Sequence, residues 1–84
     1  MEKEIALSIQ LSLGQIIRKH RKELNWSQER LAEEVDLSPR QISRIENGEQ
    51  LPSVLSLYRL RQELLIPQDP LIEQIIQASN LQDV

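Results

Sequence analysis

The chain has 84 residues, enough for one compact domain with a modest core. It contains no cysteine, which excludes disulfides and thiolate metal sites, and aromatic residues are nearly absent, so Leu, Ile, Val and Ala must build the core. The net charge of −3 argues against a general polyanion binder, but the distribution of charge matters more than its sum. Residues 18–48 carry seven basic and six acidic groups, whereas residues 49–84 carry two basic and five acidic groups. We therefore expect any contact with nucleic acid to come from residues 18–48.

The first third of the chain is predicted to hold an N-terminal arm and one helix. Residues 1–11 form the arm, whose alternating apolar residues fit either a short strand or the lead-in to a helix. Ser12 is predicted to cap a helix that runs to about Leu24. Its inner face would carry Leu13, Ile16, Ile17 and Leu24.

Two short helices with a tight turn between them are predicted next. Ser27 is a good N-cap for the first of them, and Asp36 marks its end. Ser38 followed by Pro39 starts the second in the favoured order, and Gly48 ends it because glycine adopts the left-handed conformation cheaply. The residues predicted to be buried are Leu31, Ala32, Val35, Ile42 and Ile45.

The last part of the chain is predicted to form two further helices. One opens at Pro52-Ser53 and stops at Ile66-Pro67, and its inward residues are Leu57, Leu60 and Leu64, with Leu55 as a helper. Asp69-Pro70 opens the other, in residues 69–84. The sequence thus predicts an all-α fold of five helices in a single domain.

Residues 27–47 carry the functional signal, because two short helices flank a turn and the second has a narrow apolar side. Only Ile42 and Ile45 are apolar there, so long polar side chains are left outward. Arg40 and Arg44 are four residues apart and share one face of the helix. Arginine can donate two hydrogen bonds to a guanine edge and glutamine can pair with adenine, which fits a helix in the DNA major groove.

The motifs, in order and at matching spacings, resemble the lambda Cro/CI-like (XRE-type) helix-turn-helix family of DNA-binding proteins. They are Leu13-Gly14 with Ile17 and Arg21, Ser27-Gln28 with Leu31-Ala32, the run from Ile42 to Gly48, Pro52-Ser53, and Leu57 to Leu64. The resemblance covers about Leu13 to Leu64. It implies a lambda-repressor-like domain with its core at residues 12–66 and its recognition helix at 38–47.

The resemblance also assigns roles to individual residues. Gln28 would touch a backbone phosphate, and the other DNA-binding positions would lie on or beside the recognition helix. The full predicted DNA-binding set is Gln28, Ser38, Pro39, Arg40, Gln41, Ser43, Arg44 and Asn47. Arg21 and Glu46 match a pair that the family joins as a structural salt bridge.

Three residues depart from the family pattern. Asp36 replaces the glycine that is common in the turn, and Asp costs more than Gly in a left-handed conformation. Pro39 stands where relatives often carry a polar base-reading residue, and Arg61 stands where they usually have a small apolar one. These departures put a base contact at Pro39 in doubt and leave Arg61 without a predicted role.

The apolar stripe of the predicted fifth helix is wider than packing within one chain requires, so we expect part of it to form a dimer surface. This predicted interface is Leu71, Ile72, Ile75, Ile76 and Leu81. The resulting prediction is a cytoplasmic, dimeric transcriptional regulator, most simply a repressor, from a bacterium, phage or mobile element, that reads a palindromic operator in double-stranded DNA.

The alternatives are a restriction-modification controller, an antitoxin with a protein partner, and a protein-binding adaptor that has lost DNA binding. No enzyme activity, cofactor, metal or membrane contact is predicted.

Overall fold

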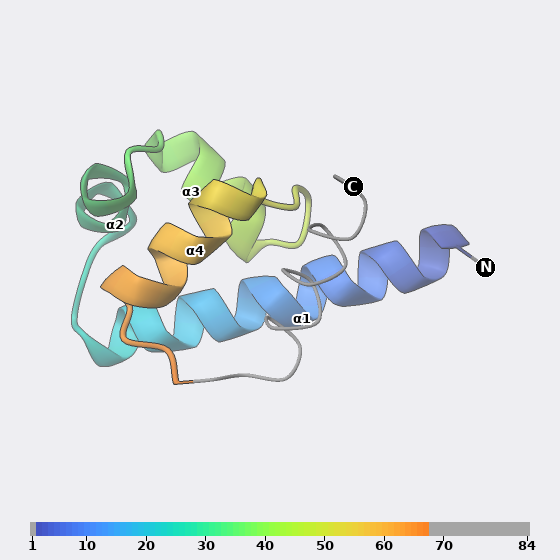
Figure 1. Cartoon of the computed structure of the whole chain (residues 1–84), viewed down its shortest axis with the longest axis horizontal. Helices are drawn as coiled ribbons and strands as arrows, with labels where there is room; N and C mark the ends of the chain where they lie inside the picture. Colours follow the sequence, from blue (N-terminus) through green and yellow to red (C-terminus); the bar gives the residue numbers. More distant parts are fainter. Residues whose placement is uncertain (1, 68–84) are drawn as a thin grey trace.

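In a computed structural model, residues 2–67 can be described, and this part of the chain contains four helices and no strand. The helices are α1 (Glu2–Glu23), α2 (Gln28–Val35), α3 (Pro39–Glu46) and α4 (Val54–Glu63). Figure 1 shows α1 running along one side of the molecule, with the three short helices packed over its C-terminal half. The all-α prediction is confirmed, whereas the predicted fifth helix at 69–84 and its apolar stripe lie outside the described residues.

α1 is much longer than predicted, because it begins at Glu2 and not at a cap formed by Ser12. That prediction was wrong: Ser12 lies inside the helix, and residues 2–11 are helical. Residues 2–13 contain no glycine or proline to stop the helix, and the acidic Glu4 in its first turn is favourable at the N-terminal end of the helix dipole. None of the helices in the described part of the chain is both long and apolar enough to cross a membrane.

The N-terminal half of α1 projects beyond the body of the molecule (Figure 1). It exposes three large apolar side chains, since Ile5, Leu7 and Leu11 are 58%, 54% and 51% exposed. No charged residue occurs between Glu4 and Arg18. This half of the helix therefore presents an apolar surface that the other described residues do not cover.

The core lies where the four helices meet. Its buried residues are Leu13, Ile17, Leu31, Ala32, Val35, Ile42, Ile45, Leu57, Leu60, Leu64 and Ile66. Ile16 and Leu24 are only partly buried and pack at the edge of this core. Leu55 is 58% exposed, so its predicted helper role was wrong. The residues at i, i+3 and i+7 that begin with Leu57 form the inner face of α4, and Leu55 lies outside that face.

Serine caps begin the three short helices. The hydroxyls of Ser27, Ser38 and Ser53 each accept a hydrogen bond from the backbone N–H three residues later. Asp36 ends α2 in the left-handed conformation, with φ 58° and ψ 46°, and Gly48 follows α3 with φ 75°. The helix starts and stops around the turn are therefore the ones that the sequence predicted.

α1 and α3 approach each other closely at Gly14. A Cβ added to this glycine would lie 2.5 Å from the carbonyl oxygens of both Ile45 and Glu46. Glycine is therefore required here by space, because the neighbouring atoms belong to the backbone at the end of α3. This contact brings the middle of α1 against the C-terminal turn of α3.

Candidate nucleic-acid interface

α3 is buried on one side and presents arginines on the other. Ile42 and Ile45 are 0% and 1% exposed, which fixes the helix against the core. Arg40 and Arg44 are exposed, and neither has a salt-bridge partner among residues 2–67. Both guanidinium groups therefore keep their donors available for a ligand outside the chain.

The start of α3 is closed by a capping box. The Ser38 hydroxyl accepts from the backbone N–H of Gln41 at 3.1 Å, and the backbone N–H of Ser38 donates to Gln41 Oε1 at 2.9 Å. Pro39 occupies the first turn and is exposed. Gln41, predicted to read adenine, thus already uses its carbonyl oxygen within the helix. Its Nε2 remains available, so a bidentate contact with adenine would require the capping bond to open.

Ser43 and Asn47 lie one turn apart at the C-terminal end of α3. Asn47 caps the helix and is exposed, while Ser43 is half-buried. Asn47 Nδ2 donates to Ser43 Oγ at 3.5 Å, a long hydrogen bond that another acceptor can replace at little cost. Both side chains are therefore at least partly accessible to solvent at the C-terminal end of α3.

Arg21 of α1 and Glu46 of α3 form a buried, bidentate ion pair. Arg21 Nε donates to Glu46 Oε2 at 2.6 Å and Nη2 donates to Oε1 at 2.9 Å. Their side chains are 10% and 2% exposed. The third guanidinium nitrogen, Nη1, donates to the backbone carbonyl of Trp26 at 2.8 Å. The structure thus brings together the two residues that the sequence paired, and it joins α1, α3 and the α1–α2 loop through one guanidinium.

The hydrogen bonds that Arg21 donates to Glu46 raise the pKa of Arg21 above its ordinary value, although burial acts in the opposite direction. A raised pKa in the folded state stabilises the fold below the pKa of the unfolded state. That contribution is lost only as the pH rises through the higher folded-state pKa. The arginine therefore stays charged and paired throughout the neutral range.

Gln28, at the start of α2, is the fourth polar group of this cluster. Its Nε2 donates to Glu46 Oε1 at 3.1 Å, so this oxygen accepts from both Arg21 and Gln28. The side chain is half-buried. The predicted phosphate-binding residue is therefore tied to the end of α3 and is not a free surface side chain.

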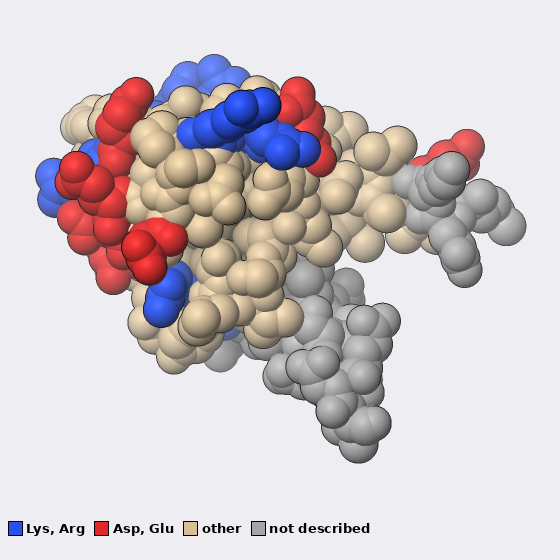
Figure 2. Space-filling model, turned by 90° about the horizontal axis from the view of Figure 1, so that it is seen from above, with Lys and Arg blue, Asp and Glu red and all other residues tan. Residues whose placement is uncertain are grey.

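Acidic side chains are concentrated at one end of the molecule, although some basic ones lie among them (Figure 2). Figure 2 shows that this is the end of the molecule where α2 lies. α2 itself carries the exposed Glu29, Glu33 and Glu34. The projecting half of α1, at the opposite end, is largely uncharged (Figure 2). A DNA backbone would be repelled by the outer side of α2, so the arginines of α3 are the favourable approach.

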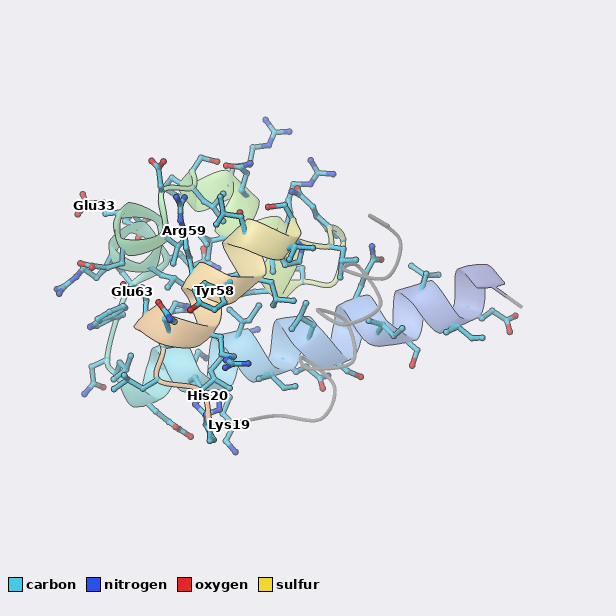
Figure 3. The ribbon with its side chains drawn as sticks, in the orientation of Figure 1. Lys19, His20, Glu33, Tyr58, Arg59 and Glu63 are labelled. Atoms are coloured by element: carbon cyan, nitrogen blue, oxygen red, sulfur yellow. The ribbon has the colours of Figure 1, made fainter. Side chains whose placement is uncertain are left out.

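α1 carries a basic cluster, and part of it faces away from the candidate interface. The cluster is formed by Arg18, Lys19, Arg21 and Lys22. In Figure 3, Lys19 and His20 lie at the edge of the molecule opposite α3. His20 is half-buried, and its Nδ1 lies 3.6 Å from Glu23 Oε2 one turn later. Within residues 2–67, no three potential metal ligands gather at one place. Lys19 is exposed and lies on the side of the molecule away from α3 (Figure 3).

Two contacts around the α2 start were missed by sequence reasoning. The guanidinium of Arg30 stacks over the Trp26 ring at 4.8 Å from its centroid, and the spacing of four residues could have indicated this. The bond between Gln28 and Glu46 joins residues 18 apart. No periodic signal in the sequence predicts a bond of that kind.

This arrangement, with a capped α2, a left-handed turn and an arginine-bearing α3, defines a helix-turn-helix. The family described as Helix-turn-helix matches residues 17–67. The chain is also 41% identical over 49 residues to an uncharacterized HTH-type transcriptional regulator of Methanothermobacter thermautotrophicus. That alignment covers 58% of this chain and 71% of the relative. No solved structure matches the chain significantly. The chain therefore belongs to the XRE-type helix-turn-helix family of DNA-binding proteins.

Proposed function

We propose that this protein is a transcriptional repressor that binds a palindromic double-stranded DNA operator as a homodimer and reads it through residues 38–47. The observation that carries the proposal is the pair of exposed arginines, Arg40 and Arg44, on a helix whose opposite side is buried. A helix fits the major groove, where arginine can donate two hydrogen bonds to guanine O6 and N7. Repression would follow from exclusion of RNA polymerase at the operator.

The remaining positions divide into contacts that read bases and contacts that position the protein. Gln28, Ser43 and Asn47 would donate to phosphate or to the groove edge, which fixes the orientation of α3 without reading sequence. Ser38 and Pro39 start the helix and point its N-terminal end toward the groove. Gln41 differs from these positions, because its carbonyl oxygen already accepts a hydrogen bond in the capping box. Its Nε2 is available and supports a single hydrogen bond to a base acceptor.

A homodimer follows from the size of the site that one domain can read. One recognition helix contacts only about half of a specific operator. Two copies related by a two-fold axis would place their recognition helices roughly 34 Å apart, one turn of DNA. The proposed interface is the apolar stripe of residues 71–81, which lies outside the described residues.

Binding-site selection from randomised double-stranded DNA tests the proposal directly, followed by fluorescence anisotropy at several salt concentrations. We expect one palindromic motif and an affinity that falls as salt rises. Arg44→Ala should relax the preference at one base position per half-site, at a cost of about 1–3 kcal/mol there. Gln28→Ala should weaken all sites about equally, because phosphate carries no sequence.

Lys19→Ala is the matched control, since it removes one positive charge from the side opposite α3 (Figure 3). It should leave the selected motif unchanged. If no motif is selected and affinity does not depend on salt, DNA recognition is refuted and the protein-binding adaptor becomes the better interpretation. Sedimentation as a monomer at high micromolar concentration would refute the dimer.

A further inference from the structure

Glu46 is a buried carboxylate on the helix proposed to enter DNA, and such a group should repel phosphate. Its side chain is 2% exposed, and Arg21 neutralises it through two hydrogen bonds. The ion pair explains how the buried Glu46 carboxylate is tolerated on this helix. It does not explain why Glu46 Oε1 accepts a further hydrogen bond from Gln28 Nε2 at 3.1 Å.

We propose that Glu46 is a positioning residue for DNA binding, which holds the Gln28 amide in place for its phosphate contact. A free glutamine has three side-chain torsions to order before it can bind, and that ordering weakens association. The bond to Glu46 Oε1 fixes Nε2 in advance and uses one of its two hydrogens. The second hydrogen stays available as a donor to an acceptor outside the chain.

The geometry makes this support rigid. Arg21 holds the carboxylate at both oxygens and is itself anchored at the Trp26 carbonyl, so Glu46 cannot rotate with Gln28. A charged acceptor also makes a stronger hydrogen bond to the amide than a neutral one would. The chain of contacts therefore runs from α1 through the ion pair to the first residue of α2.

The direction in which Glu46→Gln changes DNA affinity distinguishes a positioning role from a purely electrostatic effect. Glu46→Gln removes a negative charge close to the proposed phosphate contact and leaves the Arg21 charge uncompensated. Coulomb attraction alone therefore predicts equal or tighter DNA binding. If Glu46 positions Gln28, binding should instead weaken, by about 2–10-fold for one side chain that must be ordered on binding.

The experiment is a double-mutant cycle on DNA affinity, with Gln28→Ala and Glu46→Gln measured singly and together on the selected operator, at a temperature where all variants are folded. We expect Glu46→Gln to weaken binding in the wild-type background, and to leave it equal or tighter once Gln28 is alanine, because only the Coulomb effect then remains. Glu34→Gln is the matched control: it removes the same charge from α2 but breaks only an exposed pair with Arg30.

An equal loss in both backgrounds would overturn the proposal, because Glu46 would then act only through the angle of α3. Tighter binding of Glu46→Gln would overturn it as well. A second measurement needs no DNA: the Gln28 side-chain NH2 should be rigid on the ps–ns timescale by 15N relaxation, and mobile in Glu46→Gln. A mobile amide in the wild-type protein would refute the positioning.

The inference rests on the proposed function, and the two can fail separately. If the wild-type protein selects no DNA, the proposed function fails and the inference about DNA binding falls with it. If it selects DNA but the cycle shows no coupling between Gln28 and Glu46, only the positioning role is wrong.

Discussion

Gly14→Ala is expected to have two opposing effects on the free energy of unfolding, and the structure indicates which of them is larger. An alanine inside a helix is more favourable than glycine by about 1 kcal/mol. The added Cβ, however, would lie 2.5 Å from two backbone oxygens, whereas ordinary contact begins at 3.4 Å, so α1 and the end of α3 must separate by roughly 0.9 Å. Overpacking costs about 1–3 kcal/mol, and rigid backbone neighbours favour the upper end. We expect a net loss of about 2 kcal/mol.

Thermal unfolding followed by far-UV circular dichroism measures this loss. For a domain of this size, about 2 kcal/mol corresponds to a fall in Tm of about 8–16 °C. Ser12→Ala is the control, because it adds the same residue at an exposed position of the same helix and should leave Tm equal or slightly higher. A Gly14→Ala protein as stable as the wild type would show that α1 can move away from α3 freely, and the close-approach argument would be refuted.

Other substitutions test the ion pair, the capping box and the turn. Arg21→Ala and Glu46→Ala should each destabilise the fold by about 3–5 kcal/mol in denaturant unfolding, because each leaves a buried charge unpaired. The double variant should lose less than the sum of the two, and simple additivity would mean that the residues do not interact. Ser38→Ala should cost about 0.5–2 kcal/mol, and Gln41→Ala should cost less in that background than alone. Asp36→Gly should raise stability by about 0.5–1 kcal/mol, because glycine adopts φ 58° without a Cβ penalty. An unchanged or lower Tm for that variant would show that the turn carries no strain.

The caps and turns were predictable because their chemistry is local. Ser27 and Ser38 precede short apolar patterns, and a serine hydroxyl satisfies a backbone N–H three residues away wherever that geometry occurs. Gly48 and Asp36 stand at left-handed positions for an equally local reason. The helix-turn-helix and its outward arginines could therefore be placed from the sequence.

The start of α1 could not be placed in the same way. The alternation of Ile5, Leu7 and Ile9 fits a strand as well as a helix. Ile5 and Leu7 are exposed and Ile9 is only half-buried, so no fully buried face distinguishes the two. Serine is favoured at helix N-caps, which is why Ser12 was predicted to begin the helix. Serine is also acceptable as an exposed residue within a helix, and that is the position of Ser12 in α1.

The bond between Gln28 and Glu46 depends on how α2 and α3 pack, which is set by the core and not by either segment alone. The sequence predicted the role of each residue separately but gave no sign that they meet.

The single helix α1 spans two regions that should differ in local stability. From Leu13 onward it is anchored in the core, whereas among the described residues Ile5, Leu7 and Leu11 stay more than half exposed. Helical segments shorter than about 12–15 residues are marginal in water without tertiary packing. Amide hydrogens in the first turns should therefore exchange through local opening, while those near Ile17 exchange only with global unfolding. Any molecule that covers the projecting half would slow exchange there first, so exchange rates along α1 provide a direct reporter of its occupancy.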